Sequence, residues 1–319
     1  MITNTISLNN TSKTILDTSK NPVYWNQIDE ETMQELIDNL SDKPWKEVIS
    51  NYPIKKHIDY IAREDRADYV ELLSLPKDAV VLDAACGWGA ILMGLAKKGY
   101  KKVVGIDSNI YTLQFIQERA KQENISNIQL VRTDPFGESR LPFEDNTFDF
   151  INMNGILEWI GSQNDIKSPY DIQLSALKEF YRILKPNGYL ALGIESRYGQ
   201  AYWLGREDHS DLKFTNLMPR FMANIVMKIL KGTPYRTWTY SHKGLKSILI
   251  AAGFKIESTY YPSPSYRFCD TLVPLDSWAV FIDYISRYGS KKKKIGFPIF
   301  KLFGLWRDMC DDFLFFVKK

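Results

Sequence analysis

The chain has 319 residues, of which 45% are hydrophobic and 13% aromatic, and its formal charge at pH 7 is +3. This length and apolar content suffice for a sizeable core, and so slight a positive charge does not demand a polyanionic partner. Cys86, Cys269 and Cys310 are too few and too far apart for a disulfide framework or a metal-ligand cluster, so we expect a reducing compartment and no metal site.

The N-terminal sequence is polar and lacks the apolar core of a signal peptide. No stretch reaches the roughly 18 uninterrupted apolar residues of a transmembrane helix. We therefore expect a cytoplasmic protein. Residues 1–22 are rich in Ser, Thr and Asn and are predicted to form a flexible arm. Apolar residues then recur at helical spacing up to Pro76, which predicts an N-terminal helical cap over residues 23–76.

After Pro76 the pattern changes to short apolar or β-branched runs that alternate with helical patterns, which predicts a parallel sheet with right-handed crossovers. The expected strands are 79–85, 101–107, 128–134, 148–154, 188–195, 255–261 and 313–319. The expected helices between them are 90–98, 109–122, 169–184 and 241–254. Two segments do not follow this alternation, residues 196–240 and 262–311, and we expect both to be lids or a small subdomain at the edge of the sheet.

Three consecutive expected strands end in an aspartate, at Asp83, Asp107 and Asp134, and the first is followed by a loop with Gly87 and Gly89. Ligands of open parallel sheets bind beyond the carboxyl ends of the strands, and glycines let a ligand approach the main chain. One carboxylate can accept hydrogen bonds from a ribose diol and another from the amine of adenine. Aspartate is also common at strand ends as a helix cap or turn residue. Together with the glycine loop, the three predict a nucleoside ligand.

The identity of the nucleoside follows from the loop itself. The dinucleotide fingerprint needs a third glycine, and in "GWGAIL" that position is Leu92. Asp83, directly before the loop, would repel a pyrophosphate. It would instead suit a ligand with positive charge, such as an amino group and a sulfonium, and this favours S-adenosylmethionine.

The segments "VVLDAACGWG", "VVGIDSN", "VRTDPFGESRLPFEDNTFDFINMNGILEWI" and "EFYRILKPNGYLAL" together resemble the class I S-adenosylmethionine-dependent methyltransferases. The resemblance covers about residues 78–195. It implies an α/β fold with a Rossmann-like, seven-stranded, mostly parallel sheet whose last strand is antiparallel. The methyltransferase domain would then occupy residues 77–319, with the insertions after strands five and six.

The resemblance also implies roles for individual residues in binding S-adenosylmethionine. The first glycine of the family's usual loop is replaced here by Ala85, a residue small enough that we expect binding to survive. By position, the methionine part of the cofactor would be lined by Asp83, Ala85, Gly87 and Gly89, the ribose held by Asp107 with Ser108, the adenine approached by Asp134, Pro135 and Phe136, and the sulfonium faced by Asn154.

Methyl transfer needs alignment of acceptor and methyl group and, for a hydroxyl acceptor, a base. His209 in "GREDHSD" could be that base or a surface histidine. Glu158 in "NGILEWI" could reach the site or serve at a helix end. Asn154 is the residue expected to contact both cofactor and acceptor.

A looser resemblance, carried by "NGILEWIG", "SRYGQAYWLGREDHSD" and "RTWTYSHKGLKSILIAAGF", links the chain to methyltransferases of polysaccharide and glycoconjugate assembly. It implies a small-molecule or glycan acceptor, in some cases lipid-linked, that is methylated on oxygen. DNA is excluded as the acceptor because "NMNG" stands where the amino-methylating DNA enzymes have [Asp/Asn]-Pro-Pro-[Tyr/Phe]. The alternatives are an RNA or protein methyltransferase and a non-catalytic module that binds S-adenosylmethionine.

The tail joins four lysines, Lys291 to Lys294, to an aromatic and apolar stretch. Residues 291–307 could rest on an anionic membrane surface, which would make the protein membrane-peripheral. The same residues could equally be a solvated charge run followed by a segment packed in the core.

Overall fold

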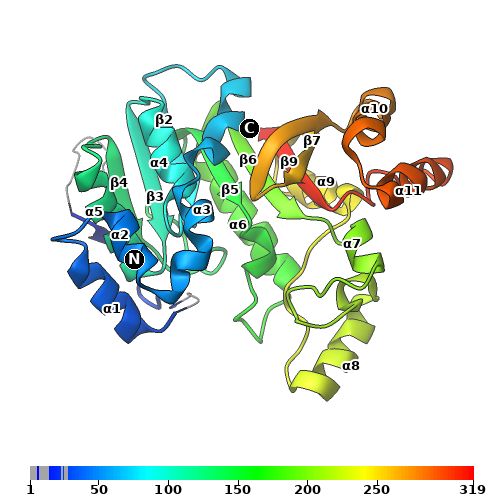
Figure 1. Cartoon of the computed structure of the whole chain (residues 1–319), viewed down its shortest axis with the longest axis horizontal. Coiled ribbons are helices and arrows are strands. Elements are labelled where there is room, and N and C mark those ends of the chain that lie inside the picture. The colour runs from blue at the N-terminus through cyan, green and yellow to red at the C-terminus, as the bar shows by residue number, and fades with distance from the viewer. Residues whose placement is uncertain (1–5, 7–13, 23, 25–27) are drawn as a thin grey trace. The chain divides into compact units, whose positions relative to one another are not determined.

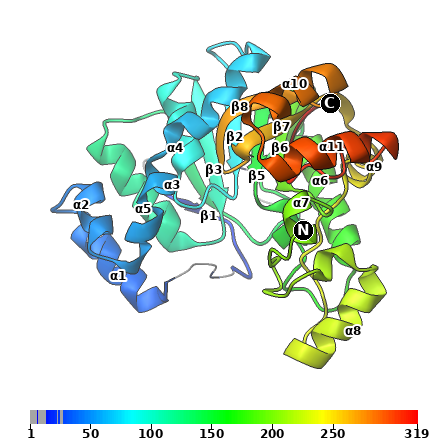
Figure 2. The same ribbon diagram turned by 45° about the vertical axis from the view of Figure 1, so that its right-hand side comes forward.

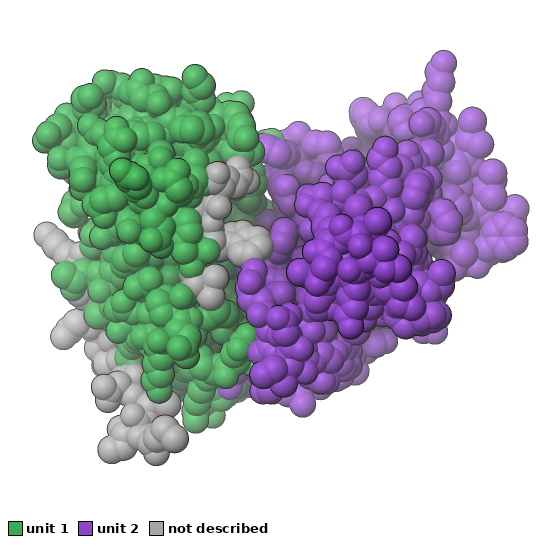
Figure 3. Space-filling model, turned by 90° about the horizontal axis from the view of Figure 1, so that it is seen from below, with its two compact units in different colours: residues 1–152, 182–188 green, residues 153–181, 189–319 purple. Residues whose placement is uncertain are grey.

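Figure 1 shows the computed structural model, which describes residues 6, 14–22, 24 and 28–319. The chain divides into two compact units, coloured separately in Figure 3. Unit 1 comprises residues 1–152 and 182–188, and unit 2 comprises residues 153–181 and 189–319.

The described residues form a nine-stranded sheet in the order β1-β4-β3-β2-β5-β6-β9-β7-β8. The strands are β1 (Leu16–Asp17), β2 (Val80–Ala84), β3 (Lys102–Asp107), β4 (Ile128–Arg132), β5 (Phe148–Asn154), β6 (Leu184–Glu195), β7 (Lys255–Ser265), β8 (Phe268–Pro274) and β9 (Asp312–Lys318). The predicted α/β class and sheet are confirmed, and β9 is antiparallel to both β6 and β7 as expected.

The count of strands differs from the predicted seven because two strands have weak sequence signals. β1 has only two residues and lies inside the predicted arm, where it pairs in parallel with β4. β8 returns from β7 as a hairpin, and the register of that pair shifts between Ser263 and Pro264. Proline cannot donate to a strand ladder. The prolines near the hairpin therefore hid this continuation of the sheet within residues 262–311.

In unit 1 the parallel pairs β2–β3 and β3–β4 bring the carboxyl ends of three strands together. Asp83 is opposite Gly105 in β3, and Asp107 is opposite Arg132 in β4. Gly105 has no room for a side chain, because an added Cβ would lie 2.7 Å from Leu92 Cδ2. The strands of unit 1 thus place Asp83, Asp107 and the glycine loop together at the carboxyl ends of the parallel strands.

The helices of unit 1 form two layers, as Figure 1 shows. Those next to the strands are α4 (Ala90–Lys97) and α5 (Ile110–Gln122). Over them lie the N-terminal helices α1 (Glu30–Asn39), α2 (Trp45–Ser50), η1 (Pro53–His57), α3 (Ile58–Ala62) and η2 (Glu64–Leu73). The region predicted as a helical cap thus contains five short helices between residues 30 and 73, which pack within unit 1.

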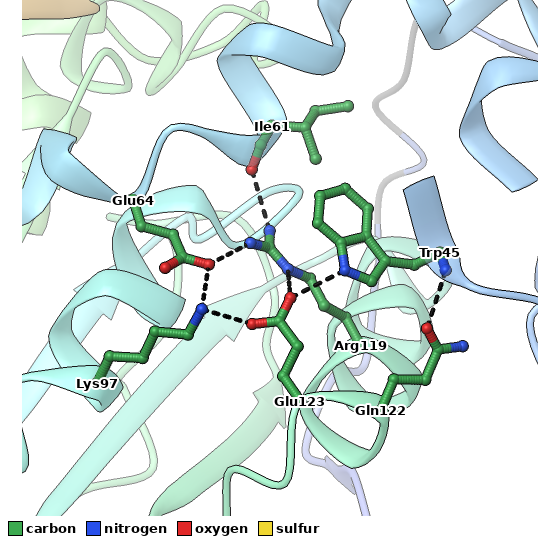
Figure 4. A network of polar contacts seen from close by, with 7 residues as sticks. All are labelled: Trp45, Ile61, Glu64, Lys97, Arg119, Gln122 and Glu123. Carbon is green, nitrogen blue, oxygen red and sulfur yellow. Dashed lines mark hydrogen bonds and ion pairs between the residues drawn. The ribbon is translucent and has the colours of Figure 1, made fainter. Parts of the chain in front are cut away.

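A buried arginine joins the two helical layers (Figure 4). Arg119 of α5, whose side chain is 1% exposed, donates to Glu64, to Glu123 and to the carbonyl of Ile61 at 2.6, 2.9 and 3.0 Å. Its guanidinium also stacks on the ring of Trp45, 4.2 Å from the centroid. A buried charge is stable only when paired and hydrogen-bonded, so this network ties the N-terminal helices to α5.

In unit 2 the antiparallel strands β6, β9, β7 and β8 carry helices on their faces and connections. These helices are η3 (Leu157–Trp159), α6 (Pro169–Ile183), α7 (Gln200–Trp203), η4 (Thr215–Leu217), α8 (Arg220–Lys231), α9 (His242–Ala251), α10 (Trp278–Tyr288) and α11 (Lys291–Leu302). Figures 1 and 2 show α10 beside α11. The segment 196–240 contains α7, η4 and α8. None of the helices in the described residues is both long and apolar enough to cross a bilayer.

Candidate functional site

The loop between β2 and α4 adopts a left-handed backbone at three positions. The φ angles are +54° at Ala85, +49° at Gly87 and +79° at Gly89. An added Cβ on Gly89 would lie 2.6 Å from Ile116, so packing requires this glycine. A Cβ on Gly87 would meet no protein atom within 4 Å, so Gly87 faces open space. The loop therefore has room beside its main chain for a ligand.

Asp107, the last residue of β3, connects this loop to that strand through hydrogen bonds. Its Oδ2 accepts from the main-chain N–H of Gly87 and its Oδ1 from that of Asn109, both at 2.9 Å. Burial raises the pKa of Asp107, and the two N–H donors offset part of that effect. A carboxylate has about four acceptor positions, so Asp107 keeps capacity for two hydroxyls of a ribose.

Asp83, the acid before the loop, is 3% exposed and belongs to a buried hydrogen-bonded chain. Its Oδ1 accepts from Nδ2 of Asn152 at 2.5 Å, and Oδ1 of Asn152 accepts from the hydroxyl of Tyr69. Burial raises the pKa of Asp83 to about 7, against the lowering effects of Asn152 and of the Arg66 charge. A carboxylate in this setting gains from a ligand that brings positive charge.

The end of β4 is partly occupied by the N-terminal segment. Oδ1 of Asp134 accepts from the main-chain N–H groups of Lys20 and Asn21 at 2.6 and 2.7 Å. Pro135 is half-buried and Phe136 is buried next to it. The carbonyl of Ser108, after β3, accepts from Nε of Arg132 at 3.0 Å. The structure thus gives the Asp134 carboxylate two main-chain partners and the Ser108 carbonyl a side-chain partner, and the contact of these residues with adenine and ribose remains a proposal.

Unit 2 holds a second group of acids, around His209. Glu158 is fully buried, and neither of its carboxylate oxygens has a hydrogen-bond partner among the described residues. Burial raises the pKa of Glu158 to about 7, and the nearby charge of His209 offsets only part of that rise. Buried polar groups are normally satisfied, so an orphaned carboxylate points to a missing ligand or to a proton-transfer role.

His209 lies between two carboxylates. Its Nε2 is 3.3 Å from Oε2 of Glu195 and 3.8 Å from Oε1 of Glu158. Burial disfavours the imidazolium, but Glu195 and Glu158 outweigh that effect and raise the pKa of His209. The ring of Trp159 packs against the imidazole with 4.6 Å between centroids, which fixes its position.

Glu195, the last residue of β6, anchors this group. It accepts from the hydroxyl of Tyr202 and lies 2.9 Å from Nη2 of Arg206. Burial alone would raise the pKa of Glu195, but His209, Tyr202 and Arg206 together hold it at about 2. Glu195 is therefore a permanent anion, and His209 takes its orientation from it.

Two other polar residues of unit 2, Asn154 and His242, have simpler surroundings. Asn154, at the end of β5, packs over Gly193, where an added Cβ would lie 2.6 Å from Asn154 Nδ2. His242 packs against Phe313 and Phe315, and burial and the Arg307 charge lower its pKa to about 4. Unlike His209, His242 is a neutral histidine of the core.

Residues 82–192 match the family described as "Methyltransferase domain". Demethylmenaquinone methyltransferases from Listeria welshimeri and Anoxybacillus flavithermus are each 26% identical, over 50% and 51% of this chain and 63% and 61% of their own lengths. The chain thus spans less than two thirds of these relatives. A SAM-dependent methyltransferase structure from Methanosarcina mazei aligns with a TM-score of 0.46 at 19% identity, covering 78% of this chain and 96% of that one.

Residues 82–192, less than half of the chain, therefore match a methyltransferase domain. The cofactor of this domain is S-adenosylmethionine. The residues of unit 1 fit it: the loop is open at Gly87, Asp107 retains acceptor capacity, and the Arg66 charge offsets only part of the burial of Asp83. Among the described residues, no group of three His, Cys, Asp or Glu side chains is placed to hold a metal ion.

The structure of this methyltransferase domain and its surroundings adds residues that the sequence did not reveal. Glu195 is the last residue of β6, so it is a strand-end acid like Asp83 and Asp107. The same pattern could have marked it as a candidate site residue. Asn152 in β5 and Tyr69 in η2 carry no sequence pattern that links them to a site. Only the fold brings them to Asp83. The closeness of Glu158 and His209 also follows from the fold alone, because 50 residues separate them in the chain.

Proposed function

We propose that the chain is an S-adenosylmethionine-dependent methyltransferase that methylates a hydroxyl oxygen of a small organic acceptor, a sugar among the candidates. S-adenosylmethionine supplies an electrophilic methyl group on a sulfonium. The residues of unit 1 bind it: Asp107 takes the ribose hydroxyls, and Asp83 offsets the positive charge of the methionine part.

The single observation that supports oxygen as the acceptor atom is the orphaned carboxylate of Glu158. An amine acceptor needs only to be neutral, whereas a hydroxyl loses its proton as it is methylated. A buried glutamate with a pKa of about 7 is matched to that task near neutral pH. We assign Glu158 as the general base: its carboxylate would take the proton of the acceptor hydroxyl, and bound S-adenosylmethionine would supply the methyl group to that oxygen.

His209 and Glu195 support Glu158 in this proposal. The imidazolium of His209, 3.8 Å from Glu158, stabilises the deprotonated carboxylate before transfer. Glu195 keeps His209 charged and oriented through the 3.3 Å contact. His209 therefore acts as a positioning residue in this scheme, and the base role that the sequence suggested for it passes to its neighbour.

The names of the relatives favour a small acceptor over RNA or protein. The two relatives are demethylmenaquinone methyltransferases, so their named acceptor is a small molecule. The segment 196–240, which carries His209, is rich in aromatic residues and supports a compact organic acceptor. Glycan and lipid-linked acceptors stay within this proposal.

The test compares Glu158→Gln with Glu207→Gln, an exposed glutamate of the same segment. Calorimetry with S-adenosylmethionine should give the same dissociation constant for both variants and the original protein. Labelled cofactor is then offered with sugar nucleotides, lipid-linked glycans, phenols and total RNA. With a hydroxyl acceptor, Glu158→Gln should lower kcat about 100-fold or more, and Glu207→Gln should not.

The pH profile distinguishes the base from a residue that only shapes the site. Rates with the original protein should rise as pH increases through about 7, because only deprotonated Glu158 accepts a proton. Transfer to total RNA or to an amine, or a full rate in Glu158→Gln, would overturn the oxygen assignment. Failure to bind the cofactor at all would favour a non-catalytic role for the domain.

We also propose that α11 makes peripheral contact with an anionic membrane. Lys291, Lys292 and Lys294 are exposed, whereas Lys293 turns inward to Asp311 and Tyr261 at 2.8 and 2.7 Å. The exposed apolar side chains of this segment are Ile295, Ile299, Leu302, Phe303 and Leu305. Lysines beside an apolar stripe are typical of interfacial helices. Unchanged pelleting with anionic liposomes after Lys291, Lys292 and Lys294 are replaced by Gln would contradict this proposal.

A further inference from the structure

Helix α8 exposes an apolar face that its own packing does not use. Its inward residues Ala223 and Met227 are buried against Tyr235, together with Leu212, Met218 and Trp238. On the opposite side Phe221, Ile225 and Ile229 are 67%, 55% and 75% exposed. A surface helix normally places polar residues on its outward face, so this face requires an explanation.

The exposed apolar residues are concentrated around this helix. The described residues include eighteen large hydrophobic side chains that are exposed, and eight of these lie between residues 203 and 230. They are Trp203, Leu204, Phe214, Phe221, Met222, Ile225, Ile229 and Leu230. Single exposed apolar residues are normal, but a concentrated group marks a site of association.

The charged residues between positions 213 and 231 are all basic. The sequence from Lys213 to Lys231 contains no Asp or Glu. Lys213 and Lys228 are exposed, and Lys231 pairs with Asp211 at 2.8 Å. Arg220 turns inward to Trp238 and adds no surface charge. The partner must therefore offer negative charge beside an apolar interior.

We propose that the outward face of α8 docks on an anionic lipid surface, with Phe221, Ile225 and Ile229 in the acyl region and Lys213 and Lys228 at the headgroups. The core of a protein–protein interface is depleted in lysine and enriched in aromatics and arginine. This face has two isoleucines and one phenylalanine beside exposed lysines, which is the composition of an interfacial helix. The contact is separate from that of α11 and does not depend on the methyltransferase activity.

The experiment is co-sedimentation of the full chain with vesicles of phosphatidylcholine alone or mixed with phosphatidylglycerol. The double variant Ile225→Gln, Ile229→Gln removes the centre of the face. Ile250→Gln is the matched control, because Ile250 is 58% exposed on α9 of the same unit. The α11 variant, with Lys291, Lys292 and Lys294 replaced by Gln, measures the other contact separately. Thermal unfolding of each variant should match the original protein, since all these positions are exposed.

The expected result is binding to the anionic vesicles that falls at least fivefold in the α8 double variant and is unchanged in Ile250→Gln. Binding that persists in the double variant, or that disappears only in the α11 variant, would overturn the proposal. So would the absence of binding by the original protein. If the double variant changes the sedimentation of the free protein instead, the face is an interface between copies of the chain and the lipid proposal is wrong.

A second measurement, the quenching of tryptophan fluorescence by brominated lipid, tests the same face without relying on the affinity of the protein for vesicles. Trp203, next to this segment and 55% exposed, should be quenched by brominated phosphatidylcholine in the anionic vesicles. The quenching should be lost in Trp203→Phe. Quenching of equal size in that variant would show that another tryptophan enters the lipid, and the docking of this face would be refuted.

Discussion

Asn152 donates a hydrogen bond of 2.5 Å to the buried carboxylate of Asp83, and the hydroxyl of Tyr69 donates to the amide oxygen of Asn152. The amide is thereby oriented with its NH₂ group toward the acid. One neutral donor does not replace the water that a carboxylate loses on burial. Asp83 is thus held in a state that favours either a proton or a ligand cation.

This arrangement predicts a pH dependence of stability. The pKa of Asp83 is about 7 in the folded protein and near 3.8 when unfolded, so the folded state binds the proton more tightly. The resulting stability is complete below about pH 4 and is lost as the pH rises through 7. Asp83→Asn should flatten this part of a urea-unfolding profile and leave the variant more stable than the original protein at pH 8. Glu158 shifts in the same direction, so some slope should remain. A profile unchanged by Asp83→Asn would contradict the assigned environment.

Asp107→Ala should weaken binding of S-adenosylmethionine at least tenfold, which corresponds to about 1.4 kcal/mol. The variant loses both the acceptor for ribose hydroxyls and the bond that holds the N–H of Gly87. Calorimetry measures the dissociation constant. Asp78→Ala, which removes an exposed aspartate just before β2, is the control and should bind normally. Equal constants for both variants would refute the site described in unit 1.

Ala85→Gly should stabilise the protein by up to about 1 kcal/mol, because a left-handed backbone costs alanine more than glycine. The φ angle at Ala85 is +54°. Gly89→Ala should have the opposite effect, since its Cβ would lie 2.6 Å from Ile116 at a φ of +79°. Urea unfolding measures both changes. A loss of stability in Ala85→Gly would mean that the methyl group packs against something the geometry does not reveal.

Arg119→Met should destabilise unit 1 by about 3 kcal/mol, since removing one partner of a buried ion pair leaves the others uncompensated. Lys97 would be the one cation that the described residues leave beside Glu64 and Glu123, at 2.7 and 2.6 Å, and Glu123 would also keep the indole N–H of Trp45 at 2.9 Å. Lys121→Met is the matched control, because Lys121 is 60% exposed and its pair with Glu118 is worth about 1 kcal/mol or less. Similar unfolding midpoints for the two variants would show that the network contributes little.

The sequence predicted those parts of the fold that depend on local patterns. Apolar runs and strand-end acids located β2 to β6, β7 and β9, and the glycine loop located the cofactor-binding edge. Glu195 was not predicted although it also ends a strand, because its partner His209 belongs to the segment 196–240, whose fold the sequence does not show. β8 was missed because proline and polar residues weaken the alternation that marks a strand.

Contacts between distant segments could not be predicted. The pairing of His209 with Glu195 and Glu158 depends on how the segment 196–240 folds back within unit 2. The sequence did not predict α8 within the segment 196–240, and both faces of this helix are partly apolar. Which of them is buried depends on Tyr235 and its neighbours, and only the packed structure shows this.

The two-residue strand β1 also protects the sheet. It covers the outer side of β4, and the main chain of residues 20 and 21 is fastened to Asp134 just beyond it. An uncovered strand edge offers unpaired N–H and C=O groups to other chains. Shortened versions that start after residue 22 would therefore be prone to aggregate through β4, and a crystallisation or activity study gains by keeping these residues.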